Sequence, residues 1–119
     1  MQPAILPATP TPRLSEVVAR FLRVAEVEGR LAPQSRVKYE ECLRHVGRIL
    51  GDRPVSEYGA EDILNLKADL LARGLSISRQ VSMLSAVKGL LEFSTRSLGL
   101  TVLAPEAISI PKRPRRVNV

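Results

Sequence analysis

The sequence predicts an all-α domain, a compact bundle of four to five helices. Aromatic residues make up 3% of the chain, so the core must be built from Leu, Val, Ile and Ala, a composition that suits helices better than a β-sandwich. Apolar residues recur with helical period in four successive stretches. A glycine follows each stretch, where helices commonly end in a left-handed turn. A length of 119 residues suits one domain with one core.

The first predicted helix begins at Ser15-Glu16 and ends at Gly29. Ser15 offers an N-cap hydroxyl, and Glu16 faces the positive end of the helix dipole. The apolar stripe of this helix comprises Leu14, Val17, Val18, Phe21, Leu22 and Ala25. Residues 1–13 hold four prolines, which remove backbone donors, so we expect an extended or disordered lead-in before the helix.

The second predicted helix runs from Pro33 to about Leu50, because proline suits a first turn and Gly51 provides a stop. Its apolar stripe consists of Tyr39, Leu43, Val46 and Leu50. The outward face is rich in cations and also carries two carboxylates: Gln34, Arg36, Lys38, Arg44, His45 and Arg48, with Glu40 and Glu41. Such a face is typical of an ordinary solvated surface, and it also suits contact with a phosphate backbone.

The third predicted helix follows a connector, residues 52–59, that is rich in turn-forming residues. Glu61 and Asp62 lie in its first turn, and Arg73-Gly74 closes it. Its apolar side comprises Ile63, Leu66, Leu70 and Leu71.

The fourth predicted helix lies between Leu75 and Leu98, with Ser76 or Ser78 as its cap and Gly99 as its stop. A broad arc of one side is apolar, so we expect other helices to surround it: Ile77, Met83, Leu84, Val87, Leu90, Leu91, Phe93 and Leu98, with Gln80 among them. The remaining strip is narrow and carries Ser78, Ser82, Ser85, Lys88, Gly89, Glu92 and Arg96. Two interpretations of this strip stay open. Another helix packs closely against it, or its hydroxyls and cations bind a phosphate backbone.

The charge balance favours a polyanionic partner. The formal net charge is +6 and the isoelectric point is about 10.2. After Gly99 we expect one short helical turn between Ala104 and Ser109, followed by a basic run in which four cations crowd together: Lys112, Arg113, Arg115 and Arg116. Such a run suits contact with DNA, a solubilising tail or a localisation signal.

The sequence indicates no metal site, no cofactor and no membrane span. Cys42 is the single cysteine, so no intrachain disulfide can form and a cytoplasmic location is the default. Cys42 and His45 are spaced to share a metal, but the chain has no other Cys or His, so we interpret them as a packed thiol and a surface residue. The start of the chain lacks a signal-peptide pattern, and no stretch approaches the roughly 20 apolar residues of a membrane span.

One run in the fourth helix resembles a known family. Leu84-Ser85-Ala86-Val87-Lys88, with apolar Leu90 and Phe93 after it, is similar to a segment in the core-binding, SAM-like domain of tyrosine recombinases (phage integrases). Three earlier segments resemble the same domain in the expected order: Leu14-Ser15-Glu16 with Phe21-Leu22, Ala32-Pro33-Gln34-Ser35 with Tyr39, and Tyr58 to Ile63. Two positions depart from the family pattern, because Gly59 replaces a capping threonine and Ala104 precedes Pro105 where the family has asparagine.

The resemblance implies sequence-specific binding of double-stranded DNA. Helices from Pro33 to Leu50 and from Ser78 to Leu98 would lie across adjacent turns of the major groove, and in the family the hydroxyl that matches Ser35 lies at the phosphate backbone. The residues expected to bind DNA are Ser35, Lys38, Arg44, Arg48, Ser78, Arg79, Ser82, Ser85, Lys88, Lys112, Arg113, Arg115 and Arg116. The parent protein would act in DNA integration and recombination, in the cytoplasm and at the nucleoid when bound to DNA. It would assemble as an oligomer on DNA, whereas the isolated domain would be a monomer.

This chain is not expected to catalyse strand exchange. A tyrosine recombinase needs a nucleophilic tyrosine, arginines on the scissile phosphate and groups that transfer protons, whereas this chain has only Tyr39, Tyr58 and one histidine, His45. We therefore expect a lead-in at residues 1–13, a helical DNA-binding domain at 14–110, and a basic linker at 111–119 toward a catalytic domain outside this sequence. The alternative is a helical protein–protein interaction module whose basic tail is incidental.

Overall fold

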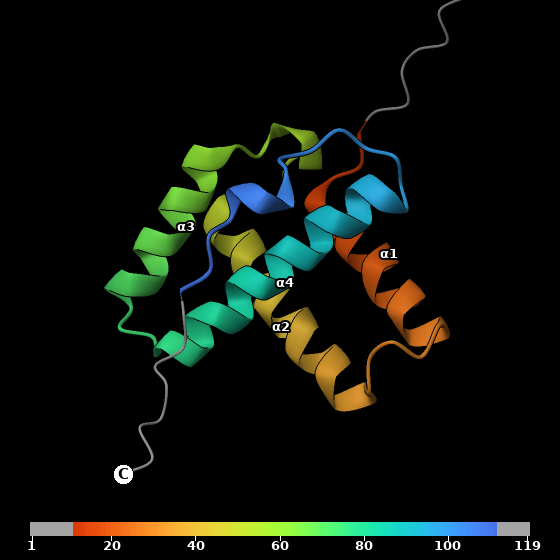
Figure 1. Cartoon of the computed structure of the whole chain (residues 1–119), viewed down its shortest axis with the longest axis horizontal. Coiled ribbons are helices and arrows are strands. Elements are labelled where there is room, and N and C mark those ends of the chain that lie inside the picture. Colours follow the sequence, from red (N-terminus) through yellow and green to blue (C-terminus); the bar gives the residue numbers. More distant parts are fainter. Residues whose placement is uncertain (1–10, 112–119) are drawn as a thin grey trace, which may run out of the picture.

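Four α-helices and two short 3₁₀ turns make up residues 11–111, the part of the chain that the computed structural model describes (Figure 1). The helices are α1 (Leu14–Val27), α2 (Pro33–Leu50), α3 (Ala60–Ala72) and α4 (Ile77–Arg96), and the turns are η1 (Val55–Glu57) and η2 (Pro105–Ala107). Within these residues the only β-type pairing is an isolated bridge between Arg13 and Pro54. The predicted all-α class is therefore confirmed, as is the extra turn between Ala104 and Ser109.

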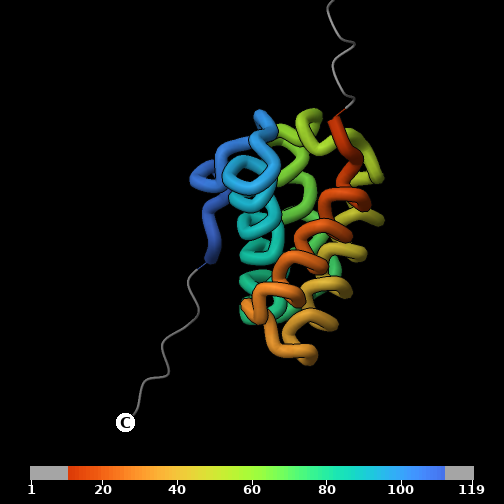
Figure 2. Tube along the Cα trace, turned by 90° about the vertical axis from the view of Figure 1, so that its right-hand side faces the viewer, coloured from red at the N-terminus to blue at the C-terminus, as the bar shows by residue number. Residues whose placement is uncertain are grey.

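Helix α2 lies at the centre of the bundle and packs against α1, α3 and α4. In Figure 1, α4 crosses in front of α2, with α1 on one side of the crossing and α3 on the other. The turned view in Figure 2 shows that the segment after α4 runs back along α4, and η2 packs against that helix. Helix α4 is thus covered by α1, α2 and the C-terminal segment.

The core confirms the broad apolar arc predicted for α4. Eight α4 residues are buried: Met83, Leu84, Ala86, Val87, Leu90, Leu91, Phe93 and Ser94. They meet buried leucines and valines of the other helices, among them Val17, Leu43, Val46 and Leu66. Two residues assigned to apolar faces are instead exposed, Leu71 by 71% and Ile77 by 39%. Helix α3 buries only a narrow face against α2, and Ile77 lies in the first turn of α4.

The prediction that Ser15 caps α1 is wrong. The N-cap is Arg13, whose N–H donates to Oε1 of Glu16 at 3.4 Å. Ser15 donates instead to the carboxylate of Asp52, through its N–H at 2.9 Å and through its hydroxyl at 2.7 Å. Asp52, in the connector after α2, is a charged acceptor and binds an N–H more strongly than a neutral hydroxyl does. It therefore satisfies the backbone N–H of Ser15 in the first turn of α1.

The connector between α2 and α3 is held by one tyrosine and one arginine. The hydroxyl of Tyr58 donates to the carbonyl of Gly51 and accepts from the N–H of Arg53 at 2.9 Å. The Arg53 guanidinium lies over the Tyr58 ring, 4.7 Å from its centre, and also bonds Asp62 at 2.6 Å. Asp62 in turn accepts from the N–H of Gly59 at 2.8 Å, which satisfies the start of α3.

Hydrogen bonds keep two aspartates in this region charged. The N–H and the hydroxyl of Ser15 lower the pKa of the Asp52 carboxyl. The N–H of Gly59 and the guanidinium of Arg53 lower the pKa of the Asp62 carboxyl. Because both pKa values lie below the ordinary value of about 3.9, the unfolded chain takes up protons before the folded chain as the pH falls.

Acid is therefore expected to destabilise the fold through Asp52 and Asp62. The stability that they contribute is present above pH about 4 and is lost as the pH falls through their lowered pKa values. The measurement is the thermal midpoint from neutral pH to about pH 2. The variant Asp52→Asn/Asp62→Asn should have a lower midpoint at neutral pH and a shallower decline in acid. An equally steep decline in the variant would assign the acid sensitivity to other groups.

The other helix boundaries agree closely with the sequence patterns. Helix α2 occupies Pro33–Leu50 as predicted, and the stop at Gly51 has the expected positive φ of 80°. Helix α4 is capped by Ser76 and ends at Arg96, two residues before the predicted end. None of the helices in residues 11–111 combines the length and the apolar character required to cross a membrane.

Candidate nucleic-acid interface

A groove between α2 and the first half of α4 brings together most of those residues predicted to bind DNA that lie in the described part of the chain. Its volume is about 560 Å³. Nine of the predicted residues lie in the described part of the chain, and six of these line the groove: Ser35 and Lys38 from α2, and Ser78, Arg79, Ser82 and Ser85 from α4. Tyr39, Glu41, Cys42, Ser76 and Ala86 complete its walls. We call this site the α2–α4 groove.

Local helix geometry places the α4 side chains in the groove. The hydroxyl of Ser76 accepts from the N–H of Arg79 at 3.2 Å, which starts the helix and places Arg79 in its first turn. Ser78, Ser82 and Ser85 follow at spacings of four and three, so they share one face. The Ser82 hydroxyl donates to the carbonyl of Ser78 at 3.0 Å, so it would have to release this bond before donating to a ligand.

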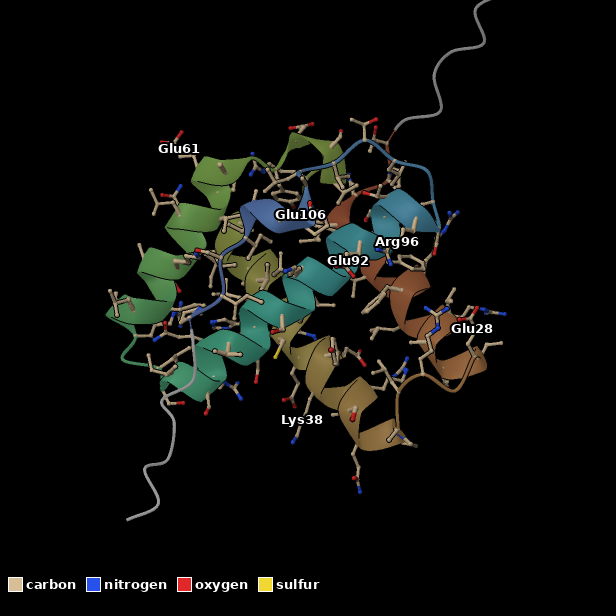
Figure 3. All side chains as sticks on the ribbon, viewed as in Figure 1. Glu28, Lys38, Glu61, Glu92, Arg96 and Glu106 are labelled. Carbon is tan, nitrogen blue, oxygen red and sulfur yellow. The ribbon has the colours of Figure 1, made fainter. Side chains whose placement is uncertain are left out.

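The charged side chains of the groove are not neutralised by neighbours. Within the described residues, Lys38, Arg79 and Glu41 form no ion pair. Lys38 points away from the bundle, below the crossing of α2 and α4 in Figure 3. Burial raises the pKa of the Cys42 thiol at the base of the groove, while the charges of Arg79 and Glu41 act on it in opposite directions. The thiol is therefore a protonated packing group, and the two cations of the groove stand against one carboxylate, that of Glu41.

Three of the nine described residues predicted to bind DNA lie outside this groove. Arg44 and Arg48 line a second groove, between α1 and α2, whose volume is about 480 Å³ and whose walls include Leu14, Val18 and Leu43. Arg44 also pairs with Glu40 at 3.1 Å. Lys88 is half-buried on α4 and is not among the residues that line either groove. The four tail cations, Lys112, Arg113, Arg115 and Arg116, lie outside the described residues.

The outward ridge of α2 separates the two grooves. Exposed residues follow it at spacings of three and four, and we call them the α2 crest: Gln34, Val37, Lys38, Glu41, Arg44 and Arg48. Lys38 thus lies on the side of the α2–α4 groove, and Arg44 and Arg48 lie on the side of the second groove. Helical spacing could have indicated Glu41 as a member of this site, because it lies three residues after Lys38 on the same face.

No protein-family model, curated protein or solved structure matches this chain. The resemblance to tyrosine recombinases therefore depends on the sequence motifs alone. In residues 11–111 no group of three or more His, Cys, Asp or Glu side chains is placed to hold a metal.

The two halves of the small-residue strip of α4 have different surroundings. Its first half lines the α2–α4 groove, whereas Gly89 in its second half faces α1. A Cβ atom at Gly89 would lie 3.9 Å from Cζ of Phe21, an ordinary contact distance. The Phe21 ring in turn packs against Tyr39 and Phe93, with ring centres 6.0 Å and 5.4 Å apart. Helix packing therefore accounts for Gly89, while the first half of the strip borders the α2–α4 groove.

Replacing Gly89 by alanine is expected to raise the free energy of unfolding by about 0.5–1 kcal/mol, because alanine favours the helix and the methyl group fits beside Phe21. Denaturant unfolding measures this change. The matched control is Gly74→Ala, which should destabilise the protein because Gly74 has a φ of +68°. A loss of stability in Gly89→Ala would mean that α1 and α4 cannot accommodate the methyl group.

Proposed function

We propose that this chain is a DNA-binding domain that holds one side of a duplex, as the SAM-like core-binding domain of a tyrosine recombinase does. The observation that carries the proposal is the convergence in the α2–α4 groove. Side chains from two helices, separated by about 40 residues in the sequence, bring hydroxyls and two unpaired cations to one concave surface. Hydroxyl, lysine and arginine donors are the groups that bind DNA phosphates in proteins.

The α2–α4 groove suits one phosphate strand. Lys38 stands on its α2 wall and Arg79 on its α4 wall, so a phosphate chain between them would meet a cation on each side. Ser35, Ser78 and Ser85 add hydroxyl donors along the same path. Binding here would release counterions from the DNA, and the affinity would therefore fall steeply with salt.

The α2 crest would then enter the major groove beside this strand. Arg44 and Arg48, on the far side of the crest, would reach phosphates of the opposite strand. Lys88 and the tail cations, Lys112, Arg113, Arg115 and Arg116, would add sequence-independent contacts. The parent protein would then use this domain in DNA integration and recombination, as an oligomer on its site.

The tyrosines support a binding role and not a catalytic one. Tyr58 is buried, its hydroxyl is bonded to Gly51 and Arg53, and burial raises the pKa of the phenol. The Tyr39 ring packs against Phe21. The arrangement of Tyr58 does not favour attack on a phosphate, which requires an accessible and activated hydroxyl. Strand cutting would therefore belong to a different part of the parent protein.

Electrophoretic mobility of a DNA duplex mixed with the chain, measured over a series of salt concentrations, tests the proposal. We expect a shift at low salt. The logarithm of the affinity for DNA should fall linearly with the logarithm of the salt concentration, with a slope of about −0.9 for each phosphate neutralised. Absence of a shift at low salt would reject DNA binding.

The second candidate function is a helical protein–protein interaction module. It is favoured by two exposed leucines on the outer side of α3, Leu64 at 65% and Leu71 at 71%. The variant Leu64→Glu/Leu71→Glu separates the two functions, because it should leave the DNA shift unchanged if the α2–α4 groove carries the function. A wild type that gives no shift at low salt but associates with itself or with another protein through Leu64 and Leu71, in a way that this variant abolishes, would favour the second candidate.

A further inference from the structure

Helix α3 has two apolar sides. Its inner side packs on the core through Ile63, Leu66 and Leu70, which are buried. Its outer side exposes Leu64 by 65% and Leu71 by 71%, and these leucines lie seven residues apart on one face of the helix. A surface helix normally has one apolar side, toward the core, and a polar side toward solvent. The outer side of α3 therefore suits contact with another chain.

The outer side of α3 has the spacing of a helix that binds in a groove. Leu64, Ala68 and Leu71 are exposed and follow one another at intervals of four and three residues, the spacing at which a docked helix presents its apolar anchors. Glu61 lies one turn before Leu64 and points away from the bundle in Figure 3. Within residues 11–111 its carboxylate forms no ion pair. We call these four residues the α3 outer face.

The second groove has the complementary chemistry. Its apolar floor is made by five residues of α1 and α2: Leu14, Val18, Ala19, Leu22 and Leu43. Two cations also line it, Arg44 and Arg48. Arg44 pairs with Glu40 at 3.1 Å, whereas Arg48 forms no ion pair in the described part of the chain. An apolar floor beside an unpaired cation suits an apolar helix side that carries an unpaired carboxylate, which is the character of the α3 outer face.

The dimensions of the two surfaces also match. Leu14 and Leu22 lie about 12 Å apart along α1, and Leu64 and Leu71 lie about 10 Å apart along α3. One chain cannot bring these surfaces together, because α1 and α3 lie on opposite sides of the crossing of α2 and α4 (Figure 1). A contact between the two surfaces must therefore join two copies of the chain.

We propose that the α3 outer face of one copy of this chain docks in the second groove of another copy, with Leu64 and Leu71 on the apolar floor and Glu61 beside Arg48. The two surfaces differ, so the contact is head-to-tail, and every assembly that does not close into a ring keeps one free surface of each kind. The contact is small, so its dissociation constant is about 0.1–1 mM, and the chain is a monomer at micromolar concentrations.

The ion pair fixes the direction of the docked helix. Arg48 lies at the end of the groove near Leu14, because its neighbour Gly47 approaches the Leu14 side chain. The docked α3 therefore begins at this end and runs toward Leu22, in the same direction as α1. In the copy that supplies the groove, Arg48 then faces a carboxylate, and Arg44 is left for the opposite DNA strand. This association goes beyond the proposed DNA-binding function and does not depend on it.

Sedimentation equilibrium of the whole chain at about 0.1–1 mM, without DNA, tests this inference. We expect the apparent mass to rise with concentration. Glu61→Arg and Arg48→Glu should each weaken the association by about tenfold, because each places like charges at the contact. An equimolar mixture of these two variants should recover it, because the α3 outer face of the first then meets a groove of opposite charge in the second. The matched control, Glu106→Arg, makes the same change of charge on η2, outside both surfaces, and should associate like the wild type.

A second pair of variants shows which surfaces meet. Leu64→Glu/Leu71→Glu removes the α3 outer face, and Ala19→Arg fills the second groove, in each case at exposed positions where the fold is retained. Neither variant should associate alone, whereas their mixture should form a dimer and nothing larger, since one supplies the groove and the other supplies α3. A wild type that stays monomeric at about 1 mM, or an Ala19→Arg variant that associates like the wild type, overturns the inference. The mobility shift with DNA would stand in both cases.

Discussion

Removing both cations of the α2–α4 groove, in the variant Lys38→Ala/Arg79→Ala, is expected to weaken DNA binding by about 100-fold. Each cation would donate a charged hydrogen bond worth about 1.5–3 kcal/mol, and two such bonds correspond to at least this factor. The slope of log affinity against log salt should become shallower by about 0.9 for each lost phosphate contact. Both side chains project from the fold without an ion pair among the described residues, so the thermal midpoint should change little.

The matched control for this variant is Arg20→Ala/Arg23→Ala. It removes the same charge from exposed positions on α1 that line neither groove. Fluorescence anisotropy with one labelled duplex measures both variants in a series of salt concentrations. Equal losses in the two variants would mean that overall charge, and not the α2–α4 groove, determines binding.

Replacing Leu66 by alanine is expected to lower the free energy of unfolding by about 2–5 kcal/mol. Leu66 is fully buried between α3 and the rest of the core, so its truncation removes apolar burial and leaves a cavity. Leu64, two residues earlier on the same helix, is 65% exposed, and Leu64→Ala should change stability by less than about 0.5 kcal/mol. Chemical denaturation of both variants measures the difference. Similar values for the two would mean that α3 does not pack on the core through Leu66.

Most of the fold could be predicted because the signals are local. Pro33 and Gly51 bound α2, and Ser76 caps α4, in each case through contacts within one turn of the residue concerned. The role of Ser15 could not be predicted, because its acceptor, Asp52, lies 37 residues away from it. The burial of Tyr58 depends on core residues from all four helices, which meet it only in the folded chain.

The candidate site could be predicted in part for a similar reason. Helical spacing places Ser78, Ser82 and Ser85 on one face, and the structure brings that face to Ser35 and Lys38. Spacing alone could not show that the crest of α2 stands between two grooves. Arg44 and Arg48 therefore line the second groove, although their sequence pattern groups them with Lys38.

The link between Ser15 and Asp52 has a consequence for the order in which the chain folds. Residues 12–14 and 53–55 are joined by two backbone hydrogen bonds, Leu14 N–H to Arg53 at 3.0 Å and Val55 N–H to Pro12 at 2.9 Å. The first turn of α1 thus depends on partners that arrive only after α2 has been made and its connector has docked. We expect α1 to be a late element whose amide protons exchange together with those of the connector, as one cooperative unit.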